Sequence, residues 1–115
     1  MWAHLGLSVV LFTILHTLVW FSTNLQFVKG IETSKSLFIA IVLSIPITLC
    51  AFFATRIAYS ALSDSLWSVR FIAFGISYLV FPILTWTVLG ESMFTLKTLT
   101  CIFLSIVIVC IQVFL

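Results

Sequence analysis

Few side chains in this sequence could do chemistry, and His16 is the one that lies deepest in an apolar segment of the chain. Histidine can change its charge near neutral pH, and a titratable group inside a membrane-spanning segment is by default a candidate for function. The alternative is structural, a neutral imidazole that hydrogen-bonds to a neighbouring helix. A second group of polar side chains, Arg56, Tyr59, Ser60 and Asp64, lies in the stretch FATRIAYSALSD at the end of another apolar segment.

The chemistry that these residues could support does not include catalysis. The sequence contains no nucleophile paired with a base, no metal-ligand cluster and no phosphate-binding loop, so we expect neither an enzyme nor a bound cofactor. Cys50, Cys101 and Cys110 are odd in number and form no CxxC pair, which favours apolar packing over metal or redox roles. A net charge of +2 is too small to neutralise several phosphates, so nucleic acid is excluded as a partner.

The elements that must position these side chains follow from the gaps between charges. Of 115 residues, 63% are hydrophobic and 7% are charged, whereas a soluble domain carries about 25% charged residues. The uncharged segments are 1–28, 36–55, 71–89 and 98–115. About 20 apolar residues cross a hydrocarbon core of about 30 Å. We therefore predict an all-α integral membrane protein, with residues 1–115 forming a single transmembrane domain. Its four helices are expected at about 2–27, 36–59, 66–89 and 96–115.

The first apolar segment is expected to remain in the protein. It lacks the basic start and the Ala-x-Ala-like exit of a secretory signal, and signal cores are only about 7 to 15 residues long.

Polar side chains share one face on each of the first three predicted helices, at about 100° per residue. These faces hold Thr13, His16, Trp20, Thr23 and Asn24; then Ser44, Thr48, Ala51, Thr55 and Tyr59; then Gly75, Tyr78, Pro82, Thr85 and Trp86. Polar groups that face hydrocarbon cost free energy, so we predict that the three faces converge on an interior. Two alternatives stay open: the hydroxyls bond to their own helix carbonyls, and Tyr59 and Trp86 anchor the membrane interface. Trp20 and Tyr78 lie deeper.

The fourth predicted helix differs from the others. Its polar and small residues, Thr98, Cys101, Ser105 and Gln112, follow a narrow line. Small residues at four-residue spacing allow two helices to approach closely, and glutamine in lipid seeks an amide partner. We therefore predict that Cys101, Ser105 and Gln112 lie in a homodimer interface.

The orientation of the chain in the membrane is weakly specified. The first and third connections hold Lys29, Lys35 and Lys97, while Arg56 and Arg70 belong to the other side. Lys and Arg set the orientation of a membrane protein. Three basic residues on one side and two on the other are a weak bias, which leaves two interpretations. The chain inserts in one direction, or it inserts both ways, which would permit an antiparallel dimer.

The layout of the chain resembles the small multidrug resistance family of the drug/metabolite transporter superfamily. RIAYS is similar to that family's GIAYA, and Gly90-Glu91 is similar to its Gly-Glu or Gly-Gln pair. ATRIAYSALS, residues 54–63, resembles more closely the ANRIGYTALS signature of a related four-helix family. The resemblance implies a homodimer with a central chamber that Tyr59 faces, and it implies that Arg56 lies at the membrane surface.

One departure from that family limits what the resemblance implies. Its multidrug exporters carry a glutamate in the first helix, which binds a cation and a proton alternately, and here the first helix has no carboxylate. Nothing would then offset the desolvation of a cation, so we do not predict a multidrug pump.

Together these observations lead us to expect a small transporter in the plasma (inner) membrane. As a homodimer it would move a small neutral or weakly polar metabolite by alternating access. The chamber is predicted to be lined by His16, Trp20, Tyr59 and Tyr78. The alternative class is a non-transport protein, either an accessory subunit of a larger membrane complex or a small pore former.

Overall fold

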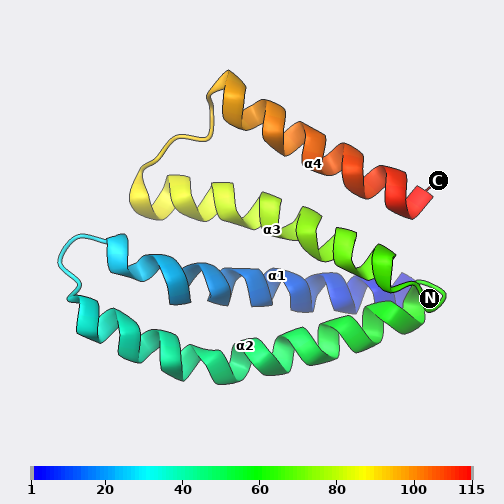
Figure 1. Cartoon of the computed structure of the whole chain (residues 1–115), viewed down its shortest axis with the longest axis horizontal. Helices are drawn as coiled ribbons and strands as arrows, with labels where there is room; N and C mark the ends of the chain where they lie inside the picture. The colour runs from blue at the N-terminus through cyan, green and yellow to red at the C-terminus, as the bar shows by residue number, and fades with distance from the viewer. Residues whose placement is uncertain (1, 115) are drawn as a thin grey trace.

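Apolar helices make up almost the whole chain in the computed structural model, which describes residues 2–114 (Figure 1). These residues form α1 (Trp2–Asn24), a short 3₁₀ turn η1 (Leu25–Phe27), α2 (Thr33–Ala61), α3 (Leu66–Leu89) and α4 (Leu96–Phe114). No strand occurs in this range, and each of the four α-helices is long and apolar enough to cross a membrane. The predicted all-α architecture is therefore confirmed, and it indicates a multi-pass integral membrane protein.

The ends of α2 differ from the bounds that the charges suggested. The helix begins at Thr33 and ends at Ala61, whereas the sequence predicted about 36–59. The first turn of α2 is polar, and the Ser36 amide donates a hydrogen bond to the Glu32 carbonyl. A helix can continue past the hydrocarbon into the polar headgroup region, so charges mark where it leaves the lipid core and not where it ends.

The connections contain residues whose backbone conformations stop the helices. Gly90 terminates α3 with φ 74°, and its amide donates to the Trp86 carbonyl. Only glycine adopts this left-handed conformation without steric cost. Between α2 and α3, Ser63 and Asp64 also have positive φ, and the Ser65 hydroxyl then caps α3 by accepting from the Ser68 amide.

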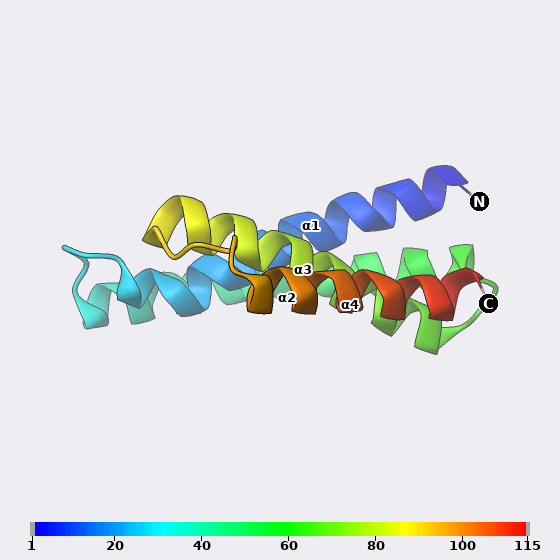
Figure 2. The same ribbon diagram turned by 90° about the horizontal axis from the view of Figure 1, so that it is seen from above.

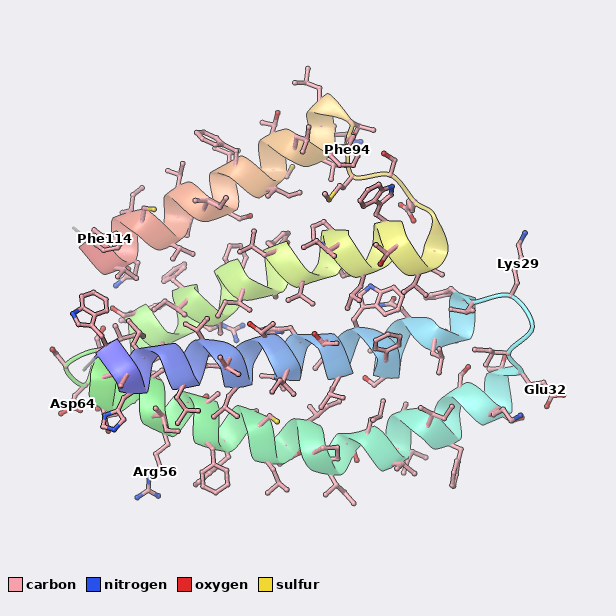
Figure 3. The ribbon with its side chains drawn as sticks, turned by 180° about the vertical axis from the view of Figure 1, so that it is seen from behind. Lys29, Glu32, Arg56, Asp64, Phe94 and Phe114 are labelled. Atoms are coloured by element: carbon pink, nitrogen blue, oxygen red, sulfur yellow. The ribbon has the colours of Figure 1, made fainter. Side chains whose placement is uncertain are left out.

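Asp64 lies at this turn, and Arg56 projects from α2 well away from it (Figure 3). The cluster in FATRIAYSALSD is therefore spread over the end of α2 and the turn that follows.

The helices are arranged in a thin layer. Figure 1 shows them side by side in the order α2, α1, α3, α4, and the molecule measures 46 × 36 × 19 Å. Figure 2 shows the same layer from its edge. Because a helix with its side chains is about 10–12 Å across, the thickness leaves room for little more than one layer of tilted helices. Both broad faces are therefore free to contact lipid or other proteins.

The core lies mainly between α1 and α2, which pack together most extensively. Ala54 and Ala58 are completely buried there, and such small side chains allow helices in a membrane to approach closely. The buried cluster consists of Phe12, Leu15, Ala54, Ala58 and Val69. α2 curves around this core (Figure 1) and contains Pro46, which removes one backbone hydrogen bond and favours bending.

Candidate functional site

A half-open cavity of about 600 Å³ lies between α1, α2 and α3. Its lining residues are Phe12, Leu15, His16, Ala51, Thr55, Leu66, Trp67, Val69, Arg70 and Ala73. Each helix contributes residues three or four positions apart, such as Phe12 and His16, Ala51 and Thr55, and Arg70 and Ala73. One face of each helix therefore forms one wall. Its volume is within the range of about 300–1,000 Å³ that is typical of small-molecule sites.

The packing of the helices explains why space remains here. α1 packs against both α2 and α3, whereas α2 and α3 contact each other far less. A gap is thus left between α2 and α3, with α1 as its floor. The side chains of Ala51 and Ala73, both half-buried, are too short to fill it.

His16 contributes the titratable side chain on the α1 wall of the cavity. Its ring stacks against Phe12 with centroids 6.4 Å apart and approaches the Ala73 backbone. Within residues 2–114, its Nε2 atom is buried and has no hydrogen-bond partner. A buried polar atom without a partner costs about 1–3 kcal/mol. Nε2 is itself covered by the chain, so a ligand in the cavity would bond to it only after the imidazole turns.

Trp20 has a different environment from His16, although both are on α1. Its side chain is 2% exposed, and the indole Nε1 donates a hydrogen bond of 3.0 Å to the Thr85 hydroxyl on α3. Both polar groups are satisfied inside the chain, and the contact joins α1 to α3. Trp20 is not among the residues that line the cavity.

The two predicted tyrosines lie on the surface of the chain. Tyr59 is 40% exposed and lines an open groove of about 900 Å³ along α2, which shares Ala51 and Thr55 with the cavity. Tyr78 is 42% exposed and lines a separate depression of about 290 Å³ with Ser77 and Phe81. Within one chain the structure therefore brings His16 into the cavity and Tyr59 next to it. A chamber lined by His16, Tyr59 and Tyr78 would have to be assembled by a dimer, and Trp20, buried and bonded to Thr85, would stay outside its lining.

Most serine and threonine hydroxyls on the predicted polar faces bond within their own helices. Thr13 donates to the Val9 carbonyl, and Thr48 donates to the Ser44 carbonyl, each at 2.8 Å. This is the alternative that the sequence left open. Thr85 is different, because its hydroxyl accepts from another helix.

α4 lies at one edge of the layer and packs against α3. The line predicted for a dimer interface is divided here: Cys101 is exposed, Gln112 is half-buried and Ser105 is 5% exposed. The Ser105 hydroxyl donates to the Cys101 carbonyl at 2.9 Å. Val109, one turn beyond Ser105, contacts Gly75 of α3, so this side of α4 turns toward its own chain.

Sequence reasoning did not identify Arg70 and Trp67 as site residues. Both line the cavity from the first two turns of α3. The spacing of Leu66, Arg70 and Ala73 does place them on one face. Periodicity within α3 cannot show which helices that face meets, so the sequence used Arg70 only as a charge that influences orientation.

No group of three or more His, Cys, Asp or Glu side chains in the described part of the chain could hold a metal ion. The fold and the cavity define a multi-pass membrane protein with a half-open site between its first three helices. The chain matches no family model, no curated protein and no solved structure. The resemblance to drug/metabolite transporters therefore rests on the residues quoted from the sequence.

Proposed function

We propose that this protein is a small transporter of the drug/metabolite transporter superfamily, similar to the small multidrug resistance family. In this proposal it moves a small metabolite across the plasma membrane by alternating access, as a homodimer. The observation that carries the proposal is the half-open cavity between three membrane-spanning helices, with the unpartnered Nε2 of His16 in its wall.

The position of His16 supports a role in binding. Ionisable side chains within membrane-spanning segments are costly and usually mark a pathway for a substrate or an ion. Substrate sites of secondary transporters lie near the middle of the bilayer. His16 lies 14 residues after the start of α1 and 8 before its end, which places it well inside the span.

The shape of a single chain supports a homodimer. Tyr59 and Tyr78 expose their polar rings on a layer that is only 19 Å thick. A second copy placed against this layer would cover these groups and convert the open cavity and groove into an enclosed chamber. Pro46 and Pro82, which lie inside α2 and α3, would allow these helices to bend during transport.

The test is a flux assay in proteoliposomes with a panel of radiolabelled polyols, nucleosides, amino acids and carboxylic acids. We expect saturable uptake of at least one class by the wild type, lowered about tenfold by His16→Ala if one hydrogen bond is lost. His4→Ala is the matched control, because His4 is exposed near the start of α1, and it should transport normally. Wild-type flux equal to that of empty liposomes, or full flux in His16→Ala, would contradict the proposal.

A second candidate is an accessory subunit of a larger membrane complex. The observation that favours it is the small buried share of each helix, which is 6% in the most apolar window of both α2 and α4. Mass measurement after mild solubilisation separates the two candidates. A two-chain particle supports the transporter, and a larger assembly containing other proteins supports the subunit.

A further inference from the structure

Arg70 gives the cavity a property that the proposed function does not specify. It is exposed, and its side chain lines the cavity. The α2–α3 connection ends just before Leu66, where α3 begins. Arg70 is four residues further on, about 6 Å along the helix. At this position the guanidinium can remain partly hydrated while it faces the space between the helices.

The residues that line the cavity carry a positive charge and no negative one. Of the residues that line it, Arg70 is charged at neutral pH, and neither an aspartate nor a glutamate of the described chain is among them. A guanidinium presents its donors in a planar fork that matches the two oxygens of a carboxylate. The electrostatics of the cavity therefore favour an anion over a cation, in agreement with the absence of a carboxylate from α1.

The rest of the lining is apolar and aromatic. Phe12 and Leu15 lie behind the α1 wall in the buried core, whereas Leu66 and Trp67 of α3 line the cavity close to Arg70 and are exposed. Trp67 is 70% exposed, so most of its indole surface is available for contact with a ligand. Such a surface suits the apolar body of a ligand whose charged end is held elsewhere.

We propose that the cavity binds an organic monoanion, with its anionic group at Arg70 and its apolar body against Leu66 and Trp67. This inference rests on the proposed function and names its substrate class, an amphipathic acid in place of the neutral or weakly polar solute that the sequence suggested. An apolar carboxylic acid from solution and the headgroup of an anionic lipid share this chemistry.

The test is equilibrium binding to the protein in phosphatidylcholine nanodiscs, with empty nanodiscs subtracted. The probes are 3-phenylpropionate and 3-phenylpropionamide, which have nearly the same size and differ in charge. We expect the wild type to bind the acid about tenfold more tightly than the amide, as one charge-assisted contact implies.

Arg70→Gln should remove this preference and leave binding of the amide unchanged, which also shows that the variant is folded. Arg70→Lys should retain part of the preference, because it keeps the charge and loses the planar fork. The matched control is Arg56→Gln, because Arg56 is also exposed, lies in the last two turns of α2, and lines the open groove along α2 but not the cavity. It should keep the full preference.

Equal affinity for acid and amide in the wild type would overturn the proposal, as would a preference that survives Arg70→Gln or is lost equally in Arg56→Gln. Nanodiscs containing phosphatidylglycerol separate the two sources of the anion. Competition by this lipid, abolished by Arg70→Gln, assigns the site to a lipid headgroup, and its absence assigns the site to a soluble acid.

Binding and transport are measured separately, so the two proposals can fail separately. Binding that depends on Arg70, without flux of any solute, keeps the anion site and removes the transporter. Flux without a preference for the acid keeps the transporter and removes the anion site.

Discussion

His16 and Trp20 show how two polar aromatic side chains, four residues apart on α1, differ in what they contact. The Trp20 indole is bonded to Thr85, whereas the His16 Nε2 atom is buried without a partner within the described residues. The sequence could place both residues on one face of the helix. It could not show which of them meets a partner, because that depends on the position of α3.

The Trp20–Thr85 contact should contribute to stability. Thr85→Val keeps the shape of the side chain and removes the acceptor, which leaves the buried indole N–H without a partner. We expect it to lower the free energy of unfolding by about 0.6–2 kcal/mol, the range for such contacts inside membranes. Denaturation in mixed micelles, followed by circular dichroism, measures the change.

The matched control for Thr85→Val is Thr87→Val on the same helix. The Thr87 hydroxyl is exposed and bonds to the Ile83 carbonyl of its own helix, so this variant should be close to the wild type. Equal losses in the two variants would show that the interhelical bond contributes nothing.

His16 should affect stability in the opposite direction. His16→Leu replaces a buried polar atom that has no partner by an apolar side chain, so we expect stability to rise by about 1 kcal/mol while function falls. The measurement is the same denaturation experiment, with exposed His4→Leu as the control. A loss of more than about 1 kcal/mol would instead mean that the imidazole holds the helices together.

At the scale of the helices, α3 and α4 are brought together by one small residue. A Cβ atom added at Gly75 would overlap the Val109 side chain of α4, whereas a Cβ at Gly6 would meet nothing within 4 Å. The sequence predicted α3 and α4 themselves from their apolar lengths. It did not indicate this contact, because the line of small residues on α4 was assigned to a second copy of the chain.

Alanine substitutions test this close approach. Gly75→Ala gains up to about 1 kcal/mol in helix propensity but must displace Val109, which typically costs about 1–3 kcal/mol. We therefore expect a net loss in the melting temperature measured in detergent. Gly6→Ala carries only the gain and should be neutral or stabilising. An increase in both variants would contradict the close packing of α3 on α4.

At the scale of the whole molecule, charge gaps were enough to predict the number and the approximate bounds of the helices. They could not predict the thin layer in the order α2, α1, α3, α4, because hydropathy measures what faces lipid and contains no information on neighbours. The cavity depends on this order, since α1 separates α2 from α3. For the same reason Arg70 was assigned to the surface.

Orientation in the membrane is a property of the whole chain, because it depends on the basic residues in all its connections. Both ends of the described chain lie at the same end of the helices, on the right in Figure 1. Adding two lysines beside the first connection, in the first turn of α2 as Thr33→Lys with Ser34→Lys, should place that connection in the cytoplasm and both termini outside. Reporter tags at the two termini measure this, with Gln at both positions as the control. A first connection found outside in the lysine variant would contradict the charge rule for this chain.

The space between α1, α2 and α3 should be an open cavity, and thiol accessibility in the membrane measures this. Cys50, Cys101 and Cys110 are first replaced by alanine, and single cysteines are then placed at Ala73 in the cavity and at Leu104, which is 52% exposed on α4. In liposomes, a water-soluble maleimide should label position 73 at least about tenfold faster, since thiols react as hydrated thiolates. Equal and slow labelling at both positions would mean that the helices enclose no accessible site.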